Sequence, residues 1–465
     1  MPRPSGPRAD ELGACPGTLA TVARSATAAL TGMSSSHRPD APPTAATAPP
    51  PEVPPPEDSF DDHVSRPAGL AHVSALSFLA ARASPAGAFV LALAGGVSLA
   101  RAGERFGARI GYGASLAAMI QTVAYLGPAR VNGPLTQALT APMLGALERR
   151  GVGPLGQFLA CAAGRILHNT LATAFFVFVL IGGLDAYAGT YDALLGSLAL
   201  PPPGVGGALA LTGLLLIAWA ALASAIQVHL YRRGLRRWPA TLLGGDREED
   251  FQEDSSRRER RFDPRAVAVA SAVAFGLLLA TTEFSLLAAV GVWLAVAWAL
   301  SRPDPEAVPA GLALALIIGG GALAFSIVGG LGLEEGLRRG TRAVLLVLVA
   351  TWRRAAAGPS GIREVARRAL GRVRRVPAVA EAGALLEELG TGGRLAPPGR
   401  ALLGALGSAR KRPLPVIDAV LGWVATESHR FRAALAPPVA RLRARPGDGA
   451  LVAFAAAPGL FLVLG

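Results

Sequence analysis

The chain has 465 residues, of which 51% are hydrophobic, and a mean hydropathy of +0.41. These values lie well above those of soluble globular proteins and predict a membrane protein. The formal net charge is +13, carried almost wholly by arginine because Lys411 is the only lysine. No aromatic side chains alternate with the arginine clusters to stack against bases, so we expect no nucleic-acid partner.

The sequence lacks several common catalytic and metal-binding motifs. Lys411 is followed by Arg412 and lacks the glycine-rich frame of a phosphate-binding loop. Cys15 and Cys161 give neither a disulfide framework nor a thiolate metal site, and the six histidines show no metal-ligand spacing. We therefore predict no enzyme and no metal or other cofactor, so that any energy from ATP comes from a separate protein.

The chain opens with a head, residues 1–66, whose many prolines predict disorder. A first apolar run follows over 84–100, with small residues at every fourth position: Ala88, Ala92, Gly96 and Ala100. Such a row predicts a helix face on which a neighbouring backbone packs closely within a membrane. An alanine- and glycine-rich composition also produces such rows by chance, so both interpretations stay open.

Further apolar runs occupy 108–126, 135–147, 155–181 and 207–231. The run 155–181 contains three polar residues on neighbouring helix positions: Arg165, His168 and Asn169. Polar groups at membrane depth are costly, so this group is a predicted substrate-binding site. The alternative is a helix that begins near Arg165, with these side chains at the membrane interface.

Residues 246–261 are mostly charged and indicate a linker, 239–260, between a first membrane domain, 67–238, and a second domain, 261–465. The second domain contains apolar runs at 265–280, 284–300, 308–331, 341–352 and 449–464. Counting all such runs, we expect an all-α, polytopic membrane protein with roughly nine to eleven spans. The arginines that close the run 207–231 place that end in the cytoplasm.

A basic arm, 361–431, separates the last two apolar runs and predicts two amphipathic helices. The apolar stripe of the first includes Ile362, Leu370, Leu385 and Leu389, and that of the second includes Val420, Val424 and Phe431. Neither helix is apolar all round, so neither is expected to span a bilayer. The arm is therefore expected to lie in the cytoplasm, along the membrane surface or against a soluble partner.

The second domain resembles the transmembrane T component of energy-coupling factor transporters, which are ABC importers for vitamins and metal ions. The resemblance rests on the opening Phe262-Asp263-Pro264-Arg265, the segment from Glu335-Gly336-Leu337 to Leu348, and two arm helices before a last span. It implies separate ABC-type ATPase subunits that dock on short Ala-Arg-Gly motifs, one in each arm helix. The corresponding residues here are Glu388, Leu389, Gly390, Ser428, His429 and Arg430. Only Gly390 keeps the residue type of the motif.

The first domain is similar in length and in its small-residue row to the substrate-binding S components of these transporters. The resemblance implies a fused membrane subunit that couples ATP hydrolysis elsewhere to uptake of a small molecule, in the inner (cytoplasmic) membrane. The alternative function is a non-transport membrane scaffold whose basic arm lies on anionic lipid.

Overall fold

The computed structural model describes residues 67–83, 88–127, 132–238, 261–280, 282–301, 307–373, 375–389, 413–430 and 445–464. Every regular element in these ranges is a helix, which confirms the all-α prediction. The predicted head, 1–66, and the predicted linker, 239–260, lie outside the described residues.

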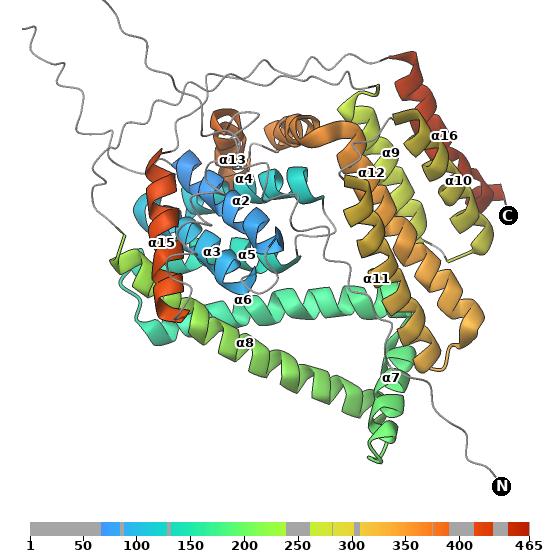
Figure 1. Ribbon diagram of the computed structural model, residues 1–465, viewed down its shortest axis with the longest axis horizontal. Coiled ribbons are helices and arrows are strands. Elements are labelled where there is room, and N and C mark those ends of the chain that lie inside the picture. The colour runs from blue at the N-terminus through green and yellow to red at the C-terminus, as the bar shows by residue number, and fades with distance from the viewer. Residues whose placement is uncertain are drawn as a thin grey trace, which may run out of the picture. The chain divides into compact units, whose positions relative to one another are not determined.

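The described residues of the first half form seven α-helices and one π-helical turn (Figure 1). They are α2 (Pro67–Ala83), α3 (Ala88–Phe106), α4 (Ala108–Leu126), α5 (Asn132–Arg149), α6 (Pro154–Phe175), η2 (Phe176–Ile181), α7 (Leu184–Ser197) and α8 (Gly204–Arg236). Gly107 separates α3 from α4 with a φ of 87°, a backbone conformation that residues with a β-carbon rarely adopt.

The second half comprises α9 (Pro264–Ala280), α10 (Phe284–Ser301), α11 (Ala307–Val328), α12 (Gly332–Arg372), α13 (Pro377–Glu388), α15 (Pro413–Arg430) and α16 (Pro446–Leu464). Several of these helices begin at a proline, whose fixed φ suits the first helical position and whose missing N–H costs nothing there. The 41-residue α12 joins a predicted membrane segment to the start of the arm and is bent at Gly358, where φ is 64°. Pro359 follows the bend and prevents a regular helix from continuing through it.

Four helical segments of the described residues are long and apolar enough to cross a membrane: Pro154–Ile181, Gly204–Arg236, Phe284–Ser301 and Val308–Val328. The prediction of nine to eleven spans is therefore not supported. Residues 88–100 of the predicted apolar run 84–100 lie in α3, which continues into Arg101, Glu104 and Arg105, and α9 has only 17 residues. Apolar composition alone did not separate these buried helices from spanning ones.

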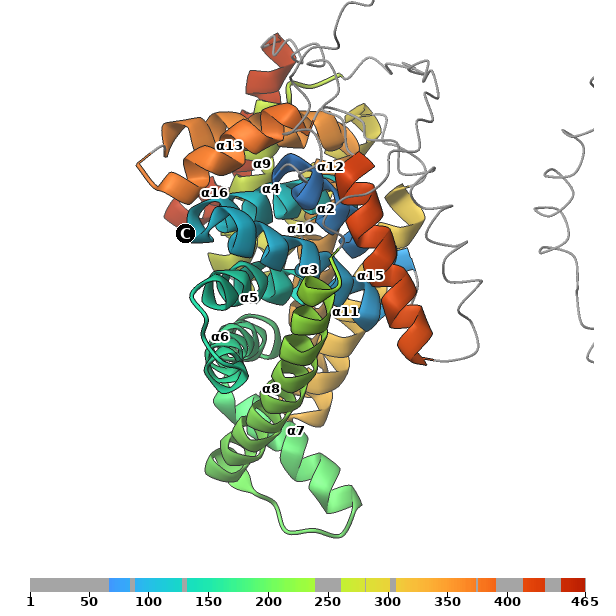
Figure 2. The same ribbon diagram turned by 90° about the vertical axis from the view of Figure 1, so that its left-hand side faces the viewer.

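The helices form two main hydrophobic cores. The first core unites residues of α2, α3, α4, α5 and α8 with Leu385 of α13, Leu389 just after α13, and Val424 of α15. Figures 1 and 2 show α13 beside α4, and α15 beside α2 and α3. The packing therefore joins the arm to helices from the first half of the chain.

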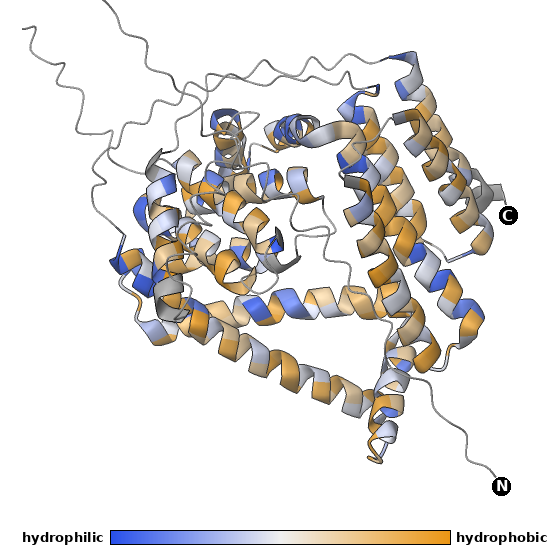
Figure 3. Ribbon diagram, viewed as in Figure 1, coloured by the Kyte–Doolittle hydropathy of each residue, from blue (hydrophilic) through white to orange (hydrophobic). Residues whose placement is uncertain are grey.

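The second core is built from α9, α10, α12 and α16, with Ala124 of α4 at its edge. At its centre the indole rings of Trp293 and Trp352 meet edge to face, with centroids 5.3 Å apart. Figure 3 shows hydrophobic residues along most of α9, α10 and α11, and hydrophilic residues in the first turns of α12. The helix α12 thus carries the chain from the second core toward the first.

Candidate functional site

The arm interface is the contact of α13 and α15 with α2, α3 and α4. On α13 the apolar stripe faces α4 and α2, and Leu385, Leu386 and Leu389 are buried. Gly113 of α4 allows the close approach, because a β-carbon there would lie 2.6 Å from the Cβ of Glu381. At the edge, Arg109 pairs with Glu381 at 2.7 Å. The α13 part of the predicted stripe is thus covered by the chain itself.

The second arm helix is tied to the end of α8 by charge. The carboxylate of Asp418 accepts hydrogen bonds from Arg233 Nε and Nη2, at 2.9 and 2.8 Å, and pairs with Arg237 at 2.7 Å. The hydrogen bonds from Arg233 hold the pKa of Asp418 below its usual value, so the carboxylate is charged at neutral pH. This contact connects the arm directly to a helix that can span a membrane.

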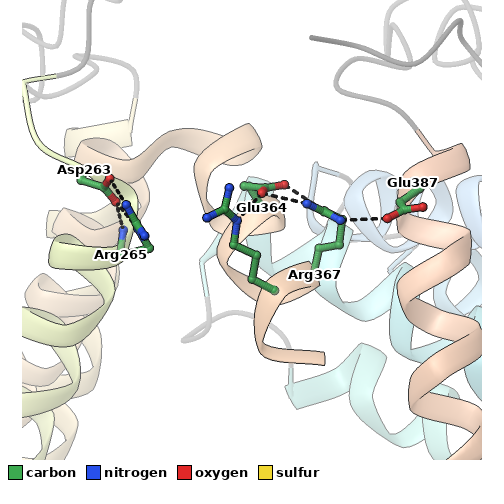
Figure 4. A network of polar contacts seen from close by, with 6 residues as sticks. Asp263, Arg265, Glu364, Arg367 and Glu387 are labelled. Atoms are coloured by element: carbon green, nitrogen blue, oxygen red, sulfur yellow. Dashed lines mark hydrogen bonds and ion pairs between the residues drawn. The ribbon is translucent and has the colours of Figure 1, made fainter. Parts of the chain in front are cut away.

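The first turns of the arm contain a network of ion pairs (Figure 4). Glu364 accepts hydrogen bonds from Arg367 and Arg368, and Arg367 also reaches Glu387 of α13 at 2.8 Å. The bonds from Arg367, followed by those from Arg368, lower the pKa of Glu364 despite its burial. The network connects the end of α12 to α13.

The opening of α9 is anchored to α16 in a similar way. Asp263 caps the helix by accepting a bond from the backbone N–H of Arg265 at 2.8 Å, and it also pairs with the guanidinium of Arg265. The backbone N–H of Asp263 in turn donates to Asp448 at 2.9 Å. The Asp263-Pro264-Arg265 sequence therefore has a structural role at the start of the second core.

One buried histidine, on α2 close to Arg363 of the arm, was not predicted to take part in a helix contact. His72 of α2 lies 3.4 Å from Gln121 of α4. Burial, and then the nearby Arg363 of the arm, lower the pKa of His72 to about 4, so the imidazole is neutral at neutral pH. A lone histidine in an apolar run gives no sequence signal for such a contact.

Of the predicted ATPase-docking residues whose side chains the structure describes, one is exposed and two are buried. Glu388 is exposed, but Leu389 is only 1% exposed and lies in the first core. Ser428 is equally buried, and its hydroxyl donates to the Ala425 carbonyl at 2.8 Å. Gly390 and the side chains of His429 and Arg430 lie outside the described residues.

The predicted substrate-binding residues lie inside α6. Arg165 and His168 are buried and Asn169 is half-buried. Because α6 begins at Pro154, Arg165 lies in the middle of the helix, and the alternative of a helix that starts near Arg165 is wrong. The guanidinium therefore lies within a segment long enough to cross a membrane.

Arg165 is held by an amide from α8 that the sequence analysis did not single out. Its Nε donates to Gln227 Oε1 at 3.1 Å, and Nη2 makes a second bond to the same oxygen. The Gln227 amide nitrogen donates to Thr140 of α5 at 2.9 Å, and the Cys161 thiol donates to the Gln227 oxygen at 3.2 Å. A polar side chain inside the apolar run 207–231 was the available signal. The cluster joins α5, α6 and α8.

Replacing Gln227 with leucine is expected to leave the Arg165 charge buried and without its acceptor. The loss should be about 1–3 kcal/mol of unfolding free energy, measured as a lower melting temperature in detergent. The matched control is the double variant Arg165→Met/Gln227→Leu, which removes the charge as well and should recover most of the loss. Equal melting temperatures for Gln227→Leu and the unaltered protein would contradict the pairing.

The predicted small-residue row lies against α5 and α8 in its second half. A β-carbon on Gly96 would lie 1.5 Å from the Tyr231 hydroxyl, which itself donates to Gln137 at 2.7 Å. One turn later, Ala100 lies against Gly145 of α5. A β-carbon on Gly145 would lie 1.8 Å from the Ala100 carbonyl oxygen. Ala88 and Ala92, earlier in the row, are half-buried.

Within the described residues, no three His, Cys, Asp or Glu side chains come together in a way that could hold a metal ion. Among the polar contacts that link the described helices, the arm interface with Asp418 and the Arg165 cluster both involve helices that can span a membrane. No protein-family model, curated protein or solved structure matches the chain.

Proposed function

We propose that the chain is the membrane subunit of an importer of the energy-coupling factor type, with its substrate-binding domain fused to its coupling domain. Separate ABC-type ATPases would supply the energy, and the substrate would be a small molecule, either a vitamin or a metal ion. The observation that carries the proposal is the packing of both arm helices on the first half, with Asp418 holding the end of α8.

This arrangement supports a mechanical role for the arm. Force on α15 reaches Arg233 through Asp418, and Arg233 shares α8 with Gln227. The two α8 residues are about 9 Å apart along the axis at 1.5 Å per residue. A displacement of α8 would therefore change the bonds around Arg165, which we assign to the substrate path together with His168 and Asn169.

The alternative, a scaffold whose arm lies on lipid, requires an exposed apolar stripe on the arm. The stripes of α13 and α15 are covered by α2, α3 and α4. The packing thus favours the coupling function over the lipid-surface function. The arginines at the end of α8 support a cytoplasmic arm in a multi-pass protein of the inner membrane.

The test is co-purification of ATPase subunits with the full chain from its native host. The variant Glu388→Arg/Arg430→Glu reverses one charge in each of the two predicted docking triplets. Glu388 is exposed, so the fold should persist. Its matched control is Glu334→Arg, at an exposed acid in the first turn of α12. We expect ABC-type ATPases with the unaltered chain and the control, and roughly tenfold less with the variant, which corresponds to about 1.4 kcal/mol.

Absence of ATPases from every preparation would overturn the proposal. Equal recovery of ATPases with the docking variant and the control would show that the ATPases dock elsewhere than at Glu388 and Arg430.

A further inference from the structure

A basic pocket lies between the beginning of α6 and the end of α8. Its volume is about 730 Å³. One wall is apolar and includes Leu155 and Phe158 of α6 and Val228 of α8. The remainder is formed by His229 and four arginines, Arg232, Arg233, Arg236 and Arg237, of which the last directly follows α8. The pocket thus combines a charged part with a hydrophobic part.

The arginines of the pocket outnumber the carboxylates that neutralise them. Arg233 and Arg237 share the single carboxylate of Asp418. Arg232 lies 3.5 Å from Glu148, whose same oxygen also accepts a hydrogen bond from Gln157. The Arg232 Nη1 atom is buried and makes no hydrogen bond within the described part of the chain. Arg236 is exposed. The pocket therefore has an excess positive charge that an anion would balance.

The surroundings of the pocket indicate what carries that anion. Both α6 and α8 belong to segments that can cross a membrane, and the pocket lies at their arginine-rich ends, where lipid headgroups would lie. Large apolar side chains continue from it along both helices: Leu155 is 70% exposed, and Leu159 and Leu222 are each 58% exposed. A soluble phosphate would leave this apolar surface uncovered, whereas the acyl chains of a lipid would cover it.

We propose that this pocket binds the phosphate of an anionic phospholipid, with the glycerol against Leu155 and Phe158 and the acyl chains along α6 and α8. Basic pockets between membrane helices on the cytoplasmic side suit such headgroups. The proposal requires a membrane protein but does not depend on transport.

The test is native mass spectrometry of the detergent-solubilised full chain, titrated with phosphatidylglycerol or with phosphatidylcholine. The variant Arg232→Gln/Arg236→Gln removes two pocket charges and leaves the Asp418 pairs in place. Each lost arginine should weaken phosphatidylglycerol binding about fivefold, and both together about 25-fold. The matched control is Arg150→Gln, an exposed arginine just before α6 that does not line the pocket. Its affinity should equal that of the unaltered chain.

A second variant, Leu155→Gln, tests the hydrophobic wall and carries the test if the double variant does not fold. It should weaken phosphatidylglycerol binding while all the arginines remain. Equal binding of the two lipids, or unchanged affinity in either pocket variant, would overturn the proposal. Displacement of the lipid by an excess of inorganic phosphate would also overturn it, because the pocket would then recognise a free anion.

Discussion

Replacing Leu389 with alanine is expected to destabilise the protein by about 2–5 kcal/mol, since a buried leucine leaves a cavity when it is truncated. Leu389 is 1% exposed and lies in the first core with Leu385 and Leu386. The substitution should weaken the whole contact of α13 with the first half, because the stripe of α13 packs on α4 and α2. A lower melting temperature and faster amide exchange in α13 would measure it.

The matched control is Leu333→Ala, at a leucine of α12 that is 63% exposed. It should change the unfolding free energy by no more than about 0.5 kcal/mol. If both variants melted alike, the cover of α13 by the first half would be wrong. The comparison also bears on docking experiments: an acidic residue at position 389 would disrupt the core, so lost ATPase binding would not identify a docking residue.

Replacing Gly145 with alanine is expected to force the backbones of α3 and α5 apart. The added β-carbon would lie 1.8 Å from the Ala100 carbonyl oxygen and 2.8 Å from the Glu104 backbone nitrogen. Both neighbours are backbone atoms, so one helix must move. Such overpacking costs about 1–3 kcal/mol, and sometimes more.

The matched control is Gly213→Ala in α8, where a β-carbon would meet nothing within 4 Å. Alanine inside a helix is favoured over glycine by about 0.5–1 kcal/mol, so this control should be neutral or slightly stabilising. Melting temperatures in detergent compare the two variants. Equal values would show that α3 and α5 do not approach as closely as the structure places them.

The sequence predicted the helical class and much of the helix pattern, because apolar periodicity and prolines act locally. The predicted stripe with Leu385 and Leu389 is indeed the buried face of α13 and of the residue that follows it. What covers that stripe was not predictable, since a lipid surface, a partner and α4 all match an apolar face. The span count failed for a related reason: an apolar helix can be buried by lipid or by neighbouring helices.

Within the site, Arg165 was recognisable because a charge stands out in an apolar run. Its partner Gln227 and the link from Asp418 to Arg233 were not, because both contacts join residues far apart in the chain. Sequence spacing on one helix reports which side chains share a face. It carries no information on which other helix that face meets.

The first core also sets an order of events during synthesis. Ala118 of α4 and Val424 of α15 belong to the same core, although some 300 residues separate them. At a translation rate of about 5–20 residues per second, α2, α3 and α4 are synthesised roughly 15–60 s before the helices that complete their burial. During that interval their apolar faces are open to aggregation. A chain cut short before α13 would keep them so, and would be a substrate for chaperones and proteases.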